Sequence, residues 1–437
     1  MKYVPLNRTP SLAAFDGTQR TEFVPRARSA SPWRGAVRAA AARGALSAAI
    51  AASSACTAPP PSIDASLVIT VSGEATGRSG YPFPPPTGDA VGFVDGWALS
   101  FDSLVVSIGE VTLSDTPDLA PTDQSRTGAV VARARGPWVV ELAKPGKVVA
   151  PALGVASLRA LGGAEGIPSV GRGSAGDEAV RLVTFDRLNV AGKPLDAATR
   201  YAIGYTLAPV QAAATKLNFD ADGGAALLAE MEREGAVLAY VGRATWKGAA
   251  CRSSDSAYDW SALPTTVPFK FLFKTPVAFA NCQNPELDGK PFDGEEKQRG
   301  VQVKDGVATF AELTFHNDHA FWLTADHEAA SPFFDAIAAA AVPGGPVTLE
   351  SLAELDPTAF KDRAGRALPW RSCVAPVSVP AGARRVDAGS FPASFDKSRG
   401  PTEALRNYAE VVAYLAAAQG HLNGDGLCAV SRRYPSP

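Results

Sequence analysis

The sequence predicts a mainly β protein, an antiparallel β-sandwich with helical insertions and C-terminal helices. Its 437 residues include 40 glycines and 35 prolines, which punctuate the chain with turns and suit strands better than long helices. Many apolar segments are short and alternate with polar residues, as strands with one buried face do. Because these short strands follow one another with turn signals between them, a β-sandwich is favoured over a parallel α/β sheet.

The longest expected strand begins at Trp97, directly after an Asp-Gly turn, and its alternation continues as far as Leu113. The apolar alternation changes phase near Asp102 and Ser103, which predicts a β-bulge at these residues. The other strands are expected at residues 67–71, 138–142, 180–185, 201–207, 237–246, 269–273, 301–303 and 307–316.

Four helices are expected, and three of them lie in the C-terminal part of the chain. The first covers residues 225–232, with Asp222 as its N-cap and Gly235 as its end. The others are expected at residues 333–341, 349–355 and 403–418, the last of them ended by Gly420. The chain therefore divides into a signal segment (1–55), a tether (56–65), a β-sandwich body (66–330) and a helical C-terminal extension packed on the body (331–437).

Charge and hydropathy exclude several classes of partner. The chain has 42 lysines and arginines against 44 aspartates and glutamates, a formal net charge of −2, which gives no electrostatic basis for binding nucleic acid or an anionic membrane surface. No apolar run reaches the roughly 20 residues that a membrane-spanning helix needs. We therefore expect a soluble body, with a lipid anchor as its only means of membrane attachment.

The first 55 residues have the features of a bacterial export signal. Eight lysines and arginines outnumber Asp16 and Glu22, and a short apolar segment follows at residues 44–52. Three small residues, Ser53-Ser54-Ala55, then precede Cys56, and a lipoprotein signal peptidase cuts before such a cysteine, which carries the lipid. Cleavage near Ala55 with release of a secreted protein, and no processing at all, are the alternatives.

Four further cysteines, Cys251, Cys282, Cys373 and Cys428, support export. An even number of cysteines in a chain bound for an oxidising compartment favours disulfides. Of the three possible pairings we expect Cys251–Cys282 and Cys373–Cys428, because each closes a local segment. A thiolate metal site is the alternative, although the chain contains no C-x-x-C spacing.

Three of the four histidines fall within twelve residues, at His316, His319 and His327. Imidazole and carboxylate groups together suit zinc or copper(II), and Asp318 lies among these histidines. Residues three apart on an extended strand point to opposite faces, so His316 and His319 converge only if the turn-forming pair Asn317-Asp318 bends the chain. We therefore expect His316 at a strand end, Asp318 in a turn and His319 directly beyond it.

His421 is the remaining histidine and a further candidate ligand, provided that the expected final helix packs beside the segment that contains His316. A methionine-rich copper(I) site is excluded, because the chain has only two methionines. Two other interpretations stay open for the histidines. They either form a structural cluster that hydrogen-bonds a loop, or act in acid–base catalysis.

Six short motifs are distributed along the chain: Phe-Val-Asp-Gly-Trp (93–97), Gly-Pro-Trp (136–138), Asn-Cys-Gln-Asn-Pro (281–285), His-Asn-Asp-His (316–319), Leu-Pro-Trp-Arg-Ser-Cys (368–373) and Gln-Gly-His-Leu-Asn (419–423). Together they resemble uncharacterised exported lipoproteins of myxobacteria and related Gram-negative bacteria. The resemblance extends from about Cys56 to the end of the chain. It implies a surface or periplasmic lipoprotein, but no particular activity and no catalytic residues.

The leading hypothesis is a non-catalytic cell-envelope lipoprotein that binds zinc or copper(II). Its ligands would be His316 and His319, with His327 or His421 as a third and Asp318 as a ligand or an orienting group. A lipid anchor would hold it in the outer membrane, facing the periplasm or the cell surface. The sequence identifies no protein partner.

Two alternatives remain open. The first is a metal-dependent hydrolase, in which a metal-bound water attacks the substrate and Glu312 or Glu328 is the general base. The absence of an H-E-x-x-H or similar paired motif weighs against this enzyme. The second alternative is a structural or adhesive surface lipoprotein that binds no metal.

Overall fold

The computed structural model describes most of the chain from Ala65 onward. The described residues are 65–86, 91–144, 179–186, 195–220, 224–306, 308–327, 330–374, 386–391, 394–395 and 404–432. The chain divides into two compact units, Met1–Pro59 and Pro60–Pro437, and all described residues belong to the second. The expected signal segment, Cys56 and Glu328 therefore lie outside the described residues.

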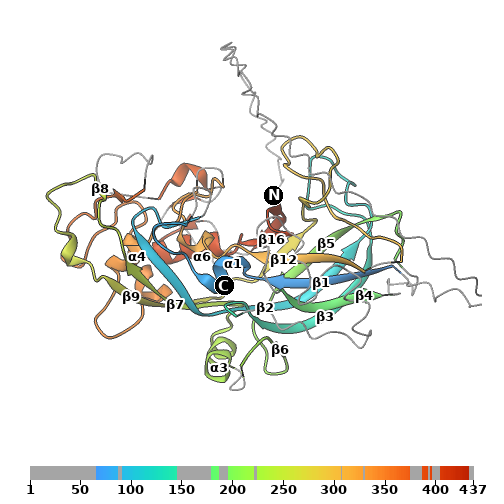
Figure 1. Ribbon diagram of the computed structural model, residues 1–437, viewed down its shortest axis with the longest axis horizontal. Coiled ribbons are helices and arrows are strands. Elements are labelled where there is room, and N and C mark those ends of the chain that lie inside the picture. Colours follow the sequence, from blue (N-terminus) through green and yellow to red (C-terminus); the bar gives the residue numbers. More distant parts are fainter. Residues whose placement is uncertain are drawn as a thin grey trace, which may run out of the picture. The chain divides into compact units, whose positions relative to one another are not determined.

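Two large sheets contain most of the strands, which confirms the prediction of a mainly β protein (Figure 1). The five-stranded sheet has the order β17 (Gly426–Leu427), β16 (Gly420–Leu422), β12 (Ala308–Phe315), β1 (Ser66–Ser72) and β4 (Val180–Asp186). Within it β1 and β12 run parallel, whereas β12 and β16 are antiparallel. Two small sheets consist of β8 (Arg252–Ser253) with β13 (Arg371–Ser372), and β14 (Ser394–Phe395) with β15 (Ala404–Leu405).

The larger sheet has nine strands. Its main path is β18 (Ala429–Arg432), β10 (Val277–Ala280), β5 (Arg200–Leu207), β2 (Trp97–Ser114), β3 (Val130–Glu141) and β6 (Thr215–Leu217). Three strands lie off this path: β11 (Val301–Gln302) pairs with β5, β7 (Leu238–Trp246) with β2, and β9 (Thr266–Phe273) with β7. Most of these pairs are antiparallel, but β3 and β6 run parallel.

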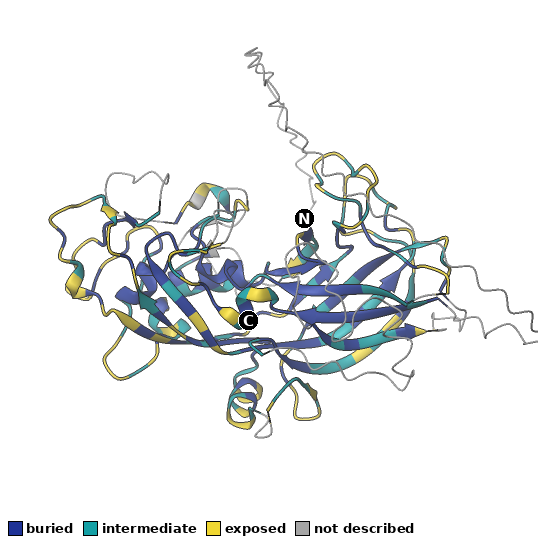
Figure 2. Cartoon of the chain, in the orientation of Figure 1, coloured by how far each residue is buried: buried dark blue, intermediate teal, exposed yellow. Residues whose placement is uncertain are grey.

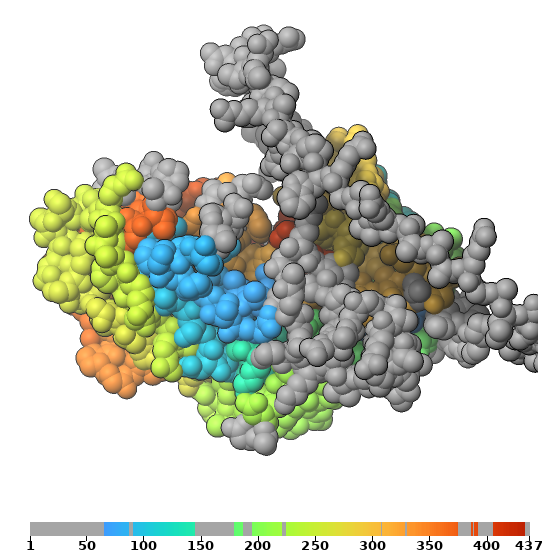
Figure 3. Space-filling model, viewed as in Figure 1, coloured from blue at the N-terminus to red at the C-terminus, as the bar shows by residue number. Residues whose placement is uncertain are grey.

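Strand β2 pairs with different strands along its length. Its first half pairs with β7, and its second half pairs with β3 and β5. In the space-filling view, the yellow-green segment that follows β7 lies beside the blue segment that leads into β2 (Figure 3). The register with β7 shifts between Phe101 and Ser103, which confirms the predicted bulge. A bulge bends a strand, and this one lies within the part of β2 that pairs with β7, before the pairing with β3 and β5 begins.

The inner faces of the two sheets pack together as in a sandwich. Buried residues run along the strands of both sheets (Figure 2). The contact includes Tyr205 of β5 and Phe315 of β12, whose ring centroids lie 6.3 Å apart in an edge-on arrangement. Gly420 of β16 lies against the Tyr205 side chain. A Cβ at position 420 would clash with the Tyr205 hydroxyl, so glycine allows this close approach. The core therefore extends to the end of β12, directly before His316.

The helices are short. Within the described ranges they are α1 (Glu74–Ser79), α3 (Ala225–Glu234), α4 (Asp335–Ala339), α5 (Leu349–Ala353) and α6 (Tyr408–Ala416), with three 3-10 turns, η1 (Trp260–Ala262), η2 (His319–Phe321) and η3 (Ala388–Ser390). The helix predicted at 225–232 is confirmed and ends at Gly235, in the left-handed region at φ 66°. Its N-cap is Gly224 rather than Asp222, which lies outside the described residues. Among the described residues, no helix is long and apolar enough to cross a membrane.

The C-terminal part differs most from the prediction. The helix expected at 403–418 is shorter, because Asn407 caps it: the Asn407 side chain accepts a hydrogen bond from the backbone N–H of Glu410 at 3.0 Å. The residues from Gly420 onward form β16, β17 and β18, which join both sheets. These strands are two to four residues long, too short for an alternating pattern. The expected helical extension is thus partly strand and completes the β body.

The expected disulfide pairing is wrong. The structure joins Cys251 to Cys373 and Cys282 to Cys428, across sequence separations of 122 and 146 residues. The first bond forms because β8 pairs with β13, and the second because β10 pairs with β18. The preference for local closure failed, because strand pairing brings distant segments together. Two disulfides are typical of proteins in an oxidising compartment.

A buried carboxylate, Asp95, makes the stability of the fold depend on pH. It is 1% exposed, and its Oδ2 accepts the backbone N–H groups of Phe334 at 2.7 Å and Asp335 at 2.8 Å. Its Oδ1 has no hydrogen-bond partner among the described residues. Burial, and after it the nearby Asp335 carboxylate, raise the pKa of Asp95 to about 7.

We expect Asp95→Asn to remove part of this pH dependence. The unfolded chain has the ordinary pKa of 3.8, so the folded form binds the proton more tightly between the two values. The free energy of unfolding therefore falls as the pH rises through this window, by about 1.4 kcal/mol for each pH unit. Asparagine keeps an acceptor oxygen and carries no charge. Urea unfolding at about pH 4.5 and about pH 7.5 should show a larger loss of unfolding free energy for the parent than for the variant, and equal losses contradict the prediction.

Candidate metal centre

The chain bends after β12 as the sequence predicts. β12 ends directly before His316, a two-residue turn follows, and His319 begins η2. Asn317 fixes the bend from a fully buried position. Its Oδ1 accepts the Tyr81 hydroxyl at 2.6 Å, and its Nδ2 donates to the carbonyl oxygen of Gly73 at 3.1 Å. His316 and His319 are thereby brought together, with ring centroids 5.8 Å apart.

His421 comes from strand β16, rather than from the end of a helix as expected. β16 pairs antiparallel with β12, so that His421 lies opposite Thr314, and the backbone N–H of His316 donates to the carbonyl oxygen of Gln419 at 2.9 Å. This register makes His316 and His421 diagonal neighbours on one face of the sheet. Their rings stack with centroids 3.9 Å apart and an interplanar angle of 11°. Strand pairing therefore positions this pair.

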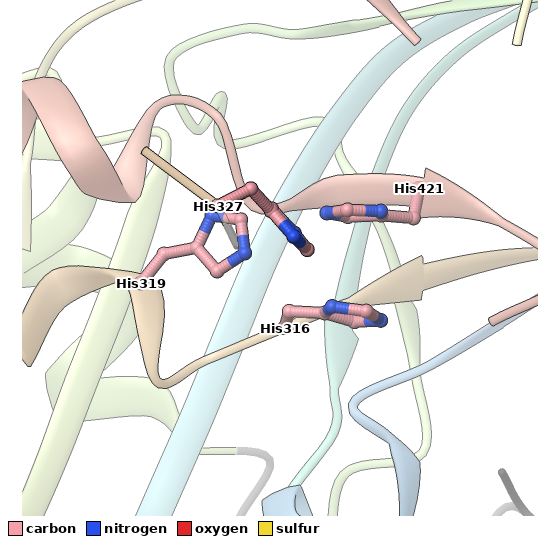
Figure 4. Close-up of side chains that lie close together, drawn as sticks. All are labelled: His316, His319, His327 and His421. Carbon is pink, nitrogen blue, oxygen red and sulfur yellow. The ribbon is translucent and has the colours of Figure 1, made fainter. Parts of the chain in front are cut away.

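All four histidines of the chain meet at one place (Figure 4). His327, in a turn after η2, is exposed, whereas His319 and His421 are 2% and 1% exposed. One ligand nitrogen from each histidine lies within 4.8 Å of the others. In a tetrahedral zinc site with Zn–N bonds of about 2.0–2.1 Å, the nitrogens lie about 3.3 Å apart. Side-chain rotations that shorten the widest gap by about 1.5 Å would complete such a site.

The buried imidazole nitrogens lack well-formed hydrogen bonds. Nε2 of His319 has no hydrogen-bond partner among the described residues. His421 has a backbone contact with Asp425, but neither of its nitrogens is aligned for a hydrogen bond. Buried polar atoms are nearly always paired, because an unpaired one costs about 1–3 kcal/mol. A metal ion would pair several of these nitrogens at once, whereas the structural alternative of hydrogen bonds to a loop leaves them unpaired.

Burial keeps two of the histidines neutral, which is the form that binds a metal. Burial, and after it the neighbouring imidazoles, lower the pKa of His319 and of His421 well below 6.5. Burial also acts to lower the pKa of His316, but the Glu74 carboxylate outweighs it and the pKa rises to about 9. Oε1 of Glu74 lies 3.2 Å from Nε2 of His316, at ion-pair distance but without the alignment of a hydrogen bond.

Glu74 is a functional candidate that the sequence did not reveal. β1 and β12 run parallel with Ser72 opposite Thr314, so the residue two positions beyond Ser72 lies beside the residue two positions beyond Thr314. Glu74, at the start of α1, reaches His316 in this way. A carboxylate near one nitrogen of a histidine orients the ring so that the other nitrogen can bind a metal. No local pattern marks Glu74, because its place depends on the pairing of distant strands.

Among the described residues, none of the carboxylates predicted at the site belongs to the group of converging ligand atoms. Asp318 is not part of the cluster: its Oδ2 accepts a hydrogen bond from Nε1 of Trp322 at 2.9 Å. This hydrogen bond orients the indole, which packs on the His319 ring with centroids 3.8 Å apart, and the Asp318 charge also helps to raise the pKa of His316. Glu312 is buried within β12, and Glu328 lies outside the described residues.

A cavity of about 400 Å³ adjoins the cluster. Three of the four histidines line it, together with the aromatic side chains of Trp322 and Tyr414 and the side chain of Arg432. Its volume lies within the range of roughly 300–1,000 Å³ that is usual for small-molecule sites. A metal ion in the cluster would therefore be accessible to a small molecule from this side.

Comparisons with protein-family models, curated proteins and solved structures find no match for this chain. The protein is therefore characterised by the features of its described residues alone. These are a mainly β fold, two disulfides and a cluster of four histidines that could hold a metal ion.

Proposed function

We propose that this protein is an exported, non-catalytic lipoprotein whose four histidines hold one zinc or copper(II) ion. The observation that carries the proposal is the convergence of His316, His319, His327 and His421, with ligand nitrogens within 4.8 Å of one another. Only four of the 437 residues are histidines, and a purely structural role gives no reason for all of them to meet.

The donor set favours zinc or copper(II). Imidazole nitrogen suits both metals. Thiolate ligation is excluded for the four described cysteines, because all of them form disulfides. The one described methionine, Met231, lies in α3 and is buried in an apolar cluster that contains none of the histidines. In this proposal Glu74 orients His316, and Asp318 holds Trp322 against the His319 ring.

The proposed cellular address rests on sequence features and on the disulfides. Two disulfides support an oxidising compartment outside the cytoplasm. The small residues before Cys56 support lipid attachment at this cysteine. We propose an outer-membrane anchor, with the protein facing the periplasm or the cell surface, as in the exported lipoproteins of myxobacteria and related Gram-negative bacteria that the sequence resembles.

A metal-dependent hydrolase is the second candidate, and the cavity beside the cluster favours it. Hydrolysis would need an open coordination position and a general base. Glu295 is the only carboxylate among the described residues that line the cavity, and it is paired with Arg299. Glu312 is buried in β12 and is not among the lining residues. A non-catalytic role therefore comes first.

Zinc is expected to raise the unfolding temperature of the mature protein with its disulfides intact. A ligand that binds only the folded state stabilises it by about 2.7 kcal/mol at a hundredfold excess over its Kd, which raises the transition by several degrees. Scanning fluorimetry with zinc, copper(II) and magnesium measures this shift. A chelator should reverse it, and magnesium, which prefers oxygen ligands, should cause none. An unchanged transition with both zinc and copper(II) contradicts the proposal.

A further inference from the structure

The cavity beside the histidine cluster has a wall that the metal site does not use. Apolar side chains form much of the lining, among them Leu415, Leu427 and Val430. Arg432, on β18, is the only lysine or arginine among the described residues that line the cavity. This wall of the cavity therefore combines one cationic side chain with apolar surface, whereas the wall at the cluster presents imidazole rings.

Arg432 is held in place without an acidic partner. Its guanidinium carbon lies 3.7 Å from the centroid of the Tyr414 ring, a cation–π contact that orients the plane of the group. Nε of Arg432 is buried and has no hydrogen-bond partner among the described residues. Within the described part of the chain, no carboxylate forms an ion pair with it. A buried, unpaired donor is rare, and a fixed guanidinium matches the two oxygens of a carboxylate.

We propose that the cavity binds a small organic carboxylate, with its charged end on Arg432 and its apolar body against Trp322. The inference rests on the proposed function for the position of the metal, beside which the ligand would lie. Glu295 also lines the cavity but does not compete for Arg432, because Arg299 pairs with it. The apolar lining favours a carboxylate with an apolar or aromatic body over an inorganic anion.

Benzoate is the probe for this site, and benzamide, of similar shape but uncharged, is its control. Isothermal titration calorimetry of the zinc-loaded protein should show benzoate binding, which Arg432→Gln should weaken by about tenfold or more. Benzamide should bind more weakly than benzoate by a similar factor. Arg243→Gln is the matched control variant, because Arg243 on β7 pairs with Asp102 and does not line the cavity. It should bind benzoate as the parent does.

Zinc affinity is measured on the same samples, so that failure of this inference and failure of the metal proposal are distinguishable. Arg432→Gln should bind zinc like the parent. No benzoate binding, or equal benzoate affinity in the parent and in Arg432→Gln, overturns the inference whatever the zinc result. Inorganic phosphate that binds at Arg432 as tightly as benzoate also overturns it. Failure of the parent to bind zinc overturns the metal proposal, and benzoate titration of the same metal-free protein then decides the carboxylate site.

Discussion

Replacing His421 with phenylalanine is expected to weaken zinc binding about a hundredfold and to leave the protein folded. Phenylalanine keeps a ring that can stack on His316, where the centroids now lie 3.9 Å apart, and removes both nitrogens. When the roughly 10–16 kcal/mol of a structural zinc site is shared among four ligands, each ligand contributes about 3 kcal/mol. That energy corresponds to about a hundredfold in affinity. Competition titration with a chromophoric chelator measures the change.

Trp322→Phe is the matched control for this experiment. It changes an aromatic side chain that packs on His319 and removes the hydrogen bond to Asp318, but leaves all four imidazoles in place. We expect it to weaken zinc binding by about tenfold, the lower end of the effect of residues that orient ligands. Unchanged zinc affinity in His421→Phe would show that His421 is not a ligand and would favour the structural interpretation of the cluster.

Removing the Cys282–Cys428 disulfide is expected to lower both the stability and the zinc affinity of the protein. The bond joins residues separated by 146 positions, and loss of a native disulfide costs about 2–5 kcal/mol. Cys428 directly follows β17, which pairs with β16 and so with the strand that carries His421. Replacing both cysteines with alanine removes the covalent link between this hairpin and the segment after β10. His421 is then held less firmly in the cluster.

The Cys251–Cys373 bond provides the comparison. It closes a similar separation of 122 residues, but neither cysteine lines the cavity or belongs to the cluster. Its replacement by two alanines should lower stability by a similar amount, about 2–5 kcal/mol, and leave zinc affinity unchanged. Urea unfolding and zinc titration of the parent and both variants test this difference. Equal zinc affinity in the two disulfide variants would contradict the role given to Cys428.

Local patterns were sufficient to predict the longer strands and the turn at the site. The alternation of β2 is long, so its change of phase located the bulge between Phe101 and Ser103. The turn between His316 and His319 follows from two adjacent turn-forming residues, Asn317 and Asp318. In each case the deciding residues are neighbours in the sequence.

Features that depend on strand pairing could not be predicted. Glu74 reaches His316 through the parallel pairing of β1 with β12, and His421 reaches it through the pairing of β16 with β12. The register between distant strands is set by tertiary packing, and strands of two or three residues carry no pattern of their own. For the same reason the sequence pointed to Asp318, the nearest carboxylate along the chain, rather than to Glu74, which lies 3.2 Å from His316 in space.

X-ray absorption spectroscopy of the zinc-loaded mature protein tests the four-histidine site most directly. The expected result is one zinc ion per chain with about four nitrogen neighbours at about 2.0–2.1 Å and the outer scattering of imidazole rings. His421→Phe should reduce the imidazole contribution by one ring. Zinc surrounded mainly by oxygen, a sulfur neighbour at about 2.3 Å, or a protein that retains no zinc after loading would each contradict the site.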